Sequence, residues 1–241
     1  MDAIKIENLT KKYGKLVAVD NLTLSVKKGE LFSLLGVNGA GKTTTIKMLS
    51  GLTNATSGDA FLNGKSITKD MAEVKSIIAV SPQETAVALG LTARENLELI
   101  CGIHGFSKEK TNEKIQELTD LLGLKPILNK KAGRISGGYQ RRLSIAMALI
   151  SDPEILFLDE PTLGLDVLVR SDLWDIIRSL KGYITIILTT HYMEEAEALS
   201  DRIAIMKDGK LLICGTAEDI KKTANTDNFE QAFVRIAKGE A

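Results

Sequence analysis

Residues 30–44 read ELFSLLGVNGAGKTT, and this stretch decides the fold. Residues 30–35 form an apolar run, which is typical of a strand buried on both faces of a parallel sheet. A glycine-rich loop follows at once, and a helix is predicted from Lys42 to Leu49, closed by Gly51. Strand, loop and helix in this order form the setting that a phosphate-binding loop requires.

The loop fits the phosphate-binding pattern G-x-x-x-x-G-K-[ST] at every fixed position. Its glycines let successive N–H groups turn inward around an anion, and the helix start adds its positive dipole end. Lys42 supplies a positive charge to the β- and γ-phosphates, and the Thr43 hydroxyl is a hard oxygen ligand for Mg²⁺. The predicted nucleotide-binding residues are Gly36, Val37, Asn38, Gly39, Ala40, Gly41, Lys42, Thr43 and Thr44.

A second motif supplies two carboxylates. Residues 155–158 are apolar and predict a buried strand, at whose carboxyl end Asp159 and Glu160 emerge. Acidic residues at a strand end also serve as helix caps, so the motif alone leaves two interpretations open. Together with the phosphate loop, it favours Asp159 as a Mg²⁺ ligand, directly or through water, and Glu160 as the group that polarises an attacking water.

Strand and helix patterns alternate along the rest of the chain. Strands are predicted near residues 4–6 and 22–26, in a hairpin at 58–65, and at 77–80, 154–158, 184–189, 202–206 and 210–214. Helical patterns at 167–180 and 193–199 separate the later strands, which predicts a parallel sheet with right-handed crossovers.

Residues 84–150 change character to helix. Thr92 and Glu95 form a capping box, Ser107 caps a second helix that Gly123 closes, and a third helix follows Gly137 and Gly138. We predict one domain over residues 1–241: an α/β core with an antiparallel β part (1–83 and 151–220), a helical insertion (84–150) and a short helical tail (221–241).

Residues 134–142, RISGGYQRR, resemble the signature of the ABC-type ATPases. The order of motifs also matches that family: phosphate loop, Gln83, signature, carboxylate strand, Asp166 and His191. The resemblance implies the α/β fold of the P-loop NTPases, with a RecA-like core, an N-terminal antiparallel β subdomain and an inserted helical subdomain. Tyr139 departs from the family, which most often has Gln there.

The resemblance also implies roles for single residues. Tyr13 looks like the aromatic ring that stacks on adenine, although a strand-edge aromatic is the alternative. Gln83 resembles the residue that contacts Mg²⁺ and the attacking water, and His191 resembles the switch histidine at the γ-phosphate. The implied catalytic set is therefore Glu160, His191 and Gln83, and the implied metal set is Thr43, Gln83 and Asp159.

The signature implies a homodimer. Ser136, Gly137 and Gly138 begin a helix and can bind an anion, so one chain carries two anion-binding surfaces for one γ-phosphate. In the family, ATP lies between the phosphate loop of one subunit and the signature of the other, here Ser136, Gly137, Gly138 and Tyr139. Asp166 matches the residue at that subunit boundary, and ATP binding drives closure.

Composition narrows the function classes. The 31 basic and 31 acidic residues cancel, which argues against nucleic acid as a partner, and Cys101 and Cys214 lack metal-ligand spacing. From the resemblance to the ABC-type ATPases, we expect the ATPase subunit of an ABC transporter, at the cytoplasmic face of a bacterial or archaeal membrane through a separate permease. The Arg141-Arg142 pair and residues 189–197 resemble the ABC-2 type exporters.

Two other functions are alternatives to a transporter subunit. One is a non-transport ABC ATPase acting on DNA or the ribosome. The other is a small-molecule P-loop kinase, against which the signature argues.

Overall fold

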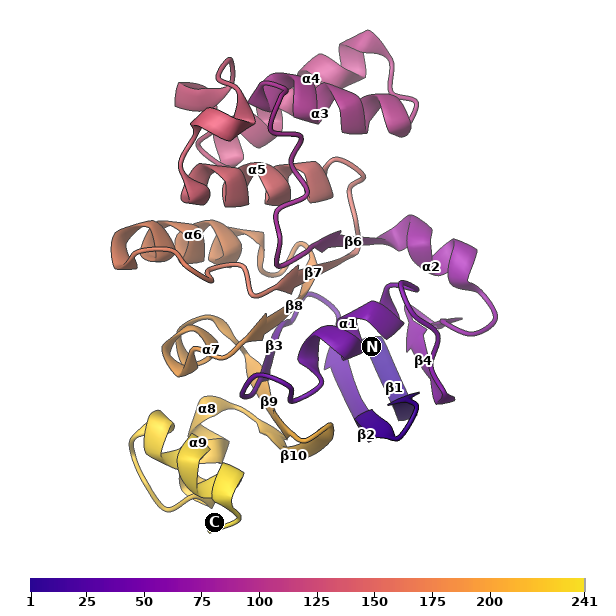
Figure 1. The fold of residues 1–241 in the computed structure, drawn as a ribbon, viewed down its shortest axis with the longest axis vertical. Helices are drawn as coiled ribbons and strands as arrows, with labels where there is room; N and C mark the ends of the chain where they lie inside the picture. Colours follow the sequence, from indigo (N-terminus) through magenta and orange to yellow (C-terminus); the bar gives the residue numbers. More distant parts are fainter. Residues whose placement is uncertain (241) are drawn as a thin grey trace.

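Two β-sheets and the helices around them make up the chain, whose computed structural model describes residues 1–240 (Figure 1). The strands are β1 (Asp2–Tyr13), β2 (Leu16–Lys27), β3 (Leu31–Leu35), β4 (Ser57–Leu62), β5 (Lys65–Ser66), β6 (Ile78–Ser81), β7 (Ile155–Asp159), β8 (Thr185–Thr190), β9 (Arg202–Lys207) and β10 (Lys210–Gly215). The helices are α1 (Lys42–Leu49), α2 (Met71–Ile77), α3 (Ala93–Ile103), α4 (Lys108–Leu121), α5 (Gly137–Leu149), α6 (Val167–Leu180), α7 (Met193–Leu199), α8 (Ala217–Thr223) and α9 (Phe229–Lys238).

The larger sheet has the strand order β10-β9-β3-β8-β7-β6. Its strands pair in parallel except at one edge, where β10 runs antiparallel to β9. Every residue of β3, β7 and β8 is buried. One face of these strands packs against α6 and the helical insertion, and the other packs against α1 and the smaller sheet. The register pairs Leu35 with Thr190 and Asp159 with Thr189, so these three strands end at one edge. The predicted parallel sheet is confirmed.

The smaller sheet is antiparallel, with the order β2-β1-β4-β5, and it confirms the predicted N-terminal β part. It lies beside α1 (Figure 1). Its inward side chains, such as Ile4 and Leu22, share one buried cluster with Phe32 of β3 and Phe157 of β7. This shared cluster fixes the small sheet to one face of the large one.

The helical insertion lies at one end of the molecule, and the tail helices α8 and α9 lie at the other (Figure 1). Thr92 and Glu95 form the predicted capping box of α3, and the Ser107 hydroxyl accepts from the Lys110 N–H at the start of α4. A second buried cluster joins Leu97 and Leu143 of the insertion to Leu156 of β7.

Three local predictions need correction. Helix α2 occupies residues 71–77, where only a strand beginning at Ile77 was expected, so that β6 begins at Ile78. Helix α5 begins at Gly137 rather than after Gly138. Ser136 stands at the N-cap position of α5 but makes no capping hydrogen bond in the described residues. The proposed domain boundaries stay a prediction. None of the helices within residues 1–240 combines the length and apolarity that a membrane crossing demands.

Candidate functional site

The glycine-rich loop, residues 36–44, runs from the end of β3 into the first turn of α1. A Cβ atom on Gly36 would lie 2.3 Å from the Met206 carbonyl oxygen, and one on Gly41 would lie 2.5 Å from that of Ala18. Gly41 also has a φ of +100°, a conformation that other residues rarely adopt. The loop can therefore keep this shape only with glycine at both positions. Its N–H groups lie next to those at the N-terminus of α1, where an anion is bound favourably.

Lys42 lies inside this loop and is 4% exposed. Its Nζ donates to the carbonyl oxygens of Gly36 at 2.7 Å and Val37 at 3.2 Å, and it lies 3.6 Å from Glu160 Oε1. Burial lowers the pKa of Lys42, whereas the Glu160 carboxylate raises it. The ammonium thus stands between the phosphate-binding loop and the second carboxylate motif.

Asp159 and Thr43 bring two hard oxygen atoms together. Asp159 Oδ1 accepts a hydrogen bond from Thr43 Oγ1 at 3.0 Å and another from Thr189 Oγ1 at 2.5 Å. A hydroxyl and a carboxylate oxygen at this distance are the donors that Mg²⁺ prefers, so these residues fit that ion. Among residues 1–240, no group of three or more His, Cys, Asp and Glu residues is placed to hold a metal ion.

Glu160 has an unusual backbone. Its φ is +47°, and its N–H is held by both the carbonyl oxygen and the hydroxyl of Thr189, at 3.1 and 3.0 Å. The side chain is directed toward the loop, where Oε2 lies 2.8 Å from His191 Nδ1. Glu160 is therefore fixed between Lys42 and His191, at the shared carboxyl ends of β7 and β8.

One cavity of about 630 Å³ unites most of the predicted site. Tyr13, Asn38, Gly39, Ala40, Gly41, Lys42, Thr43, Thr44, Gln83, Glu160 and His191 line it, together with Leu16, Val17, Ala18, Leu163 and Asp208. Gly36 and Val37 contribute through the Lys42 contacts, and Asp159 lies behind Thr43. The cavity is at the carboxyl ends of the parallel strands, where open α/β sheets bind ligands.

The predicted signature residues are not in this cavity. Ser136, Gly137, Gly138 and Tyr139 lie at the start of α5, and none of them lines the cavity. A Cβ atom on Gly138 would lie 2.3 Å from Val169 Cγ1, so glycine allows α5 to pack closely on α6. Asp166 caps α6 by accepting from the Val169 N–H at 3.0 Å. The signature and Asp166 therefore belong to adjoining helix starts, away from the loop.

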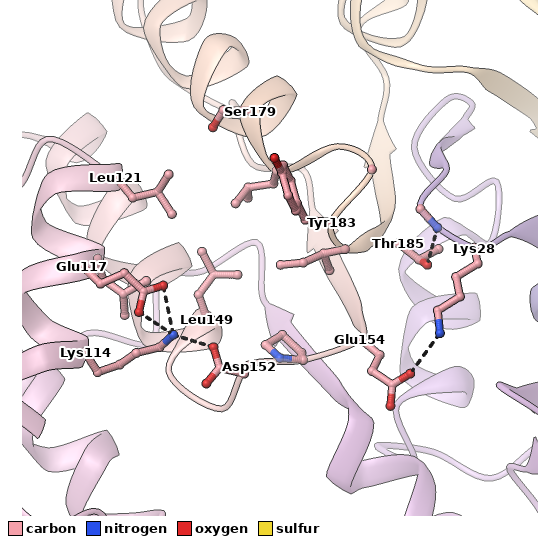
Figure 2. A pocket seen from close by; sticks show the side chains of 16 residues that line it. Lys28, Lys114, Glu117, Leu121, Leu149, Asp152, Glu154, Ser179, Tyr183 and Thr185 are labelled. Atoms are coloured by element: carbon pink, nitrogen blue, oxygen red, sulfur yellow. Dashed lines mark hydrogen bonds and ion pairs between the residues drawn. The ribbon is translucent and has the colours of Figure 1, made fainter. Parts of the chain in front are cut away.

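A larger cavity, of about 720 Å³, lies at the opposite ends of the strands (Figure 2). It is lined by Lys28, Glu154 and Thr185, which stand at or just before the starts of β3, β7 and β8. Lys114 of α4 contributes a buried ammonium that contacts Asp152 at 2.5 Å and Glu117 at 3.0 Å. Size alone would favour this cavity, but the phosphate-type loop, the carboxylates and the histidine all lie in the smaller one.

Two buried residues, Arg141 and Glu195, were assigned no role in the site from the sequence. The Arg141 guanidinium donates to the main-chain carbonyl oxygens of Gln83 and Glu160. The buried Glu195 carboxylate accepts from Thr162 Oγ1 at 2.8 Å and from Trp174 Nε1 at 3.0 Å. Burial raises the pKa of Glu195, and these hydrogen bonds oppose the shift. In the sequence, residues 189–197 were noted only for their resemblance to a group of exporters. No local sequence pattern indicates that Arg141 and Glu195 bond to residues so far away along the chain.

Comparison with known proteins places the chain among nucleotide-hydrolysing domains. The family model described as "ABC transporter" matches residues 19–163. The human protein "ATP-binding cassette sub-family A member 2" is 45% identical over 226 residues, 91% of this chain and 9% of that protein. The Escherichia coli (strain K12) protein "Probable multidrug ABC transporter ATP-binding protein YbhF" is 39% identical over 240 residues, 97% of this chain and 41% of that protein.

A solved structure described as the dimeric post-hydrolysis state of the ATP-binding cassette MJ0796, bound to ADP and Pi, has the same fold. Its TM-score is 0.78 at 29% identity, over 88% of this chain and 98% of that one. The fold class is thereby confirmed. The chain spans less than half the length of the two curated relatives.

Proposed function

Because the chain belongs to the ABC transporter family and is an ATPase domain of that family, we propose that two copies close head-to-tail on two MgATP and drive a membrane permease. One observation carries the dimer: the loop and the signature form two glycine-rich helix starts, and the signature lines no part of the nucleotide cavity. A second copy supplies the missing half of the site in trans.

At the loop, each residue of the chain has a separate task. Residues 36–44 hold the phosphates through N–H groups and Lys42. Tyr13 packs on the adenine beside the apolar rim of Leu16 and Val17, which line the same cavity. Thr43, Gln83 and Asp159 hold Mg²⁺, which neutralises phosphate charge when bound.

Hydrolysis needs a water activated next to the γ-phosphate. Glu160 takes a proton from the water while the water oxygen bonds to phosphorus and the bond to the ADP oxygen breaks. His191 lies 2.8 Å from Glu160 and is positioned to orient that carboxylate and to contact the γ-phosphate. Loss of the γ-phosphate then removes the contacts that join the two copies, and the dimer opens.

The permease docks on residues 84–96 and the adjoining face of α3. In support, Leu89 of this segment is 56% exposed, and Leu99 and Ile103 are exposed on α3. The buried Asn96 amide bonds both main-chain groups of Ala88, which fixes the segment beneath that surface. An exposed apolar surface on a fixed segment suits a short partner helix.

Export of the ABC-2 type is the favoured direction, at the cytoplasmic face of a membrane. The name of the E. coli relative, a probable multidrug transporter protein, supports it. A non-transport ATPase acting on DNA or the ribosome is the alternative, but the net charge of zero gives no support for a nucleic-acid surface. The relatives are bacterial and human, so they do not favour a bacterial or archaeal origin.

The decisive experiment measures ATP turnover by the purified chain with no acceptor added. We expect phosphate release to rise with the square of protein concentration at low concentration, because two copies form each site. Turnover that appears only when a small-molecule acceptor is added, with the acceptor recovered phosphorylated, would instead show a P-loop kinase. A rate strictly proportional to concentration, from a monomer, would overturn the dimer mechanism.

A further inference from the structure

We propose that Arg141 is a positioning residue that ties the signature helix of a subunit to the Gln83 and Glu160 segments of the same subunit. The proposal rests on the proposed ATPase function. Arg141 lies in the second turn of α5, after the signature residues, and it does not line the nucleotide cavity. It therefore acts through its contacts and not on substrate.

The contacts of Arg141 join three separate parts of the chain. Its Nη1 donates to the Pro82 carbonyl oxygen at 2.5 Å, and its Nη2 donates to that of Gln83 at 2.6 Å and that of Glu160 at 3.3 Å. The side chain is buried, with 4% of the residue exposed. A planar guanidinium can hold several acceptors in fixed directions, and a lysine ammonium cannot reproduce that fork.

Each acceptor belongs to a segment that carries a proposed catalytic residue. Gln83 follows β6 and lines the cavity, and its carbonyl oxygen accepts from Arg141. Glu160 has a left-handed φ of +47°, which a non-glycine residue keeps only where its surroundings hold it. Thr189 holds the Glu160 N–H, and Arg141 holds the Glu160 carbonyl.

In the proposed dimer, Arg141 connects the two nucleotide sites through α5. The α5 N-terminus faces the nucleotide of the partner, whereas Arg141 on the same helix holds the water-activating segments of its own subunit. Movement of α5 therefore shifts Glu160 and Gln83 together. Misplacement of a catalytic group by about 1 Å can cost roughly hundredfold in rate without altering substrate binding.

The test compares two buried cations of the insertion. Arg141→Met removes the guanidinium and its hydrogen bonds to the three carbonyl oxygens. Lys114→Met is the matched control, because Lys114 is also buried and also joins the insertion to the core, through Asp152, but at the opposite end of the strands (Figure 2). We expect Arg141→Met to lower kcat by about 10- to 100-fold with KM and the calorimetric MgATP Kd within about threefold of wild type. Lys114→Met should keep kcat within about threefold.

Arg141→Lys gives a second measurement if the Met variant folds poorly. It keeps the charge but cannot span three carbonyl oxygens, so kcat should fall between those of wild type and Arg141→Met. Wild-type kcat in Arg141→Lys, or equal losses in Arg141→Met and Lys114→Met, would overturn the positioning role. Wild-type protein that releases no phosphate would instead overturn the proposed function, which keeps the two failures distinct.

Discussion

At the scale of single residues, the site depends on a backbone held against its preference. A left-handed φ at a non-glycine residue costs about 1–3 kcal/mol, and Glu160 adopts one immediately after a strand. Two hydrogen bonds from its N–H to Thr189 offset part of that cost. This backbone conformation ends the strand and turns the Glu160 carboxylate toward Lys42 and His191.

Lys42→Ala should abolish tight MgATP binding. The substitution removes a buried charge from the phosphate site and leaves Glu160 without its cation, which costs about 3 kcal/mol or roughly a hundredfold in Kd. Calorimetric titration with MgATP measures the loss. Lys47→Ala is the control, because Lys47 lies on the exposed side of the same helix. Equal affinities for the Lys42 variant and wild type would refute the role of the loop.

At the scale of elements, Glu195 joins segments that each carry a site residue. It lies on α7, four residues after His191, and it accepts from Trp174 of α6 and from Thr162 of the loop that follows Glu160. Its Oε2 has no partner among the described residues. A buried carboxyl with an unpaired oxygen favours its proton, which is why burial raises the pKa of Glu195.

The stability of the protein should therefore depend on pH through Glu195. With its pKa raised above the usual 4.5, the folded state holds a proton that the unfolded state has released. This contribution is complete below pH 4.5 and is lost as the pH rises through the folded value. Glu195→Gln mimics the protonated form, so it should gain unfolding free energy relative to wild type as the pH rises from 5 to 8.

Urea denaturation at several pH values measures this difference. Glu194→Gln is the matched control, since Glu194 is the exposed neighbour on the same helix. A difference between Glu195→Gln and wild type that stays constant from pH 5 to 8 would show that Glu195 is ionised in the folded state.

Ser136→Arg tests the helix start that the dimer is proposed to use. The hydroxyl makes no capping bond to its own helix in the described residues, so replacing it should leave folding and monomer ATP binding intact. An arginine at the α5 N-terminus fills the space for the partner's γ-phosphate, so hydrolysis should stop. Phosphate release and MgATP Kd measured together decide the outcome, and persistent turnover would show that the signature does not act in trans.

The elements differ in how far the sequence predicts them. Helices α1, α6 and α7 were predicted with their observed bounds, because glycine, capping and periodicity signals are local. Helix α2 was missed although it is no shorter than α7, because its last residue, Ile77, was assigned to the apolar strand that follows. Arg141 and Glu195 were missed as site-supporting residues because their partners are 19 to 59 and 21 to 33 residues away. Such contacts exist only after the strands have aligned.

At the scale of the whole molecule, the large sheet brings the residues of the nucleotide cavity together, and the helical insertion holds the signature residues away from them. Parallel register brings the ends of β3, β7 and β8 together, so the loop, Asp159 and His191 meet although more than a hundred residues separate the first from the others. The insertion carries the signature on α5 to a different position. In the proposed dimer, a second copy brings its signature to the loop, and ATP is the molecule that joins the two copies.

Glu160→Gln should therefore trap an ATP-bound dimer. The amide keeps nearly the shape of the carboxylate and leaves residues 36–44 and Lys42 unchanged, so MgATP still binds, but it cannot take the proton from water. Closure is then not followed by hydrolysis, and the closed state accumulates. Gel filtration with MgATP should show a dimer for the variant and a monomer when ADP replaces ATP. The double variant Glu160→Gln/Ser136→Arg provides the control, because it should bind MgATP and elute as a monomer. A Glu160→Gln variant that binds MgATP but elutes only as a monomer would contradict the shared site, since nothing else in the mechanism would then hold two copies together.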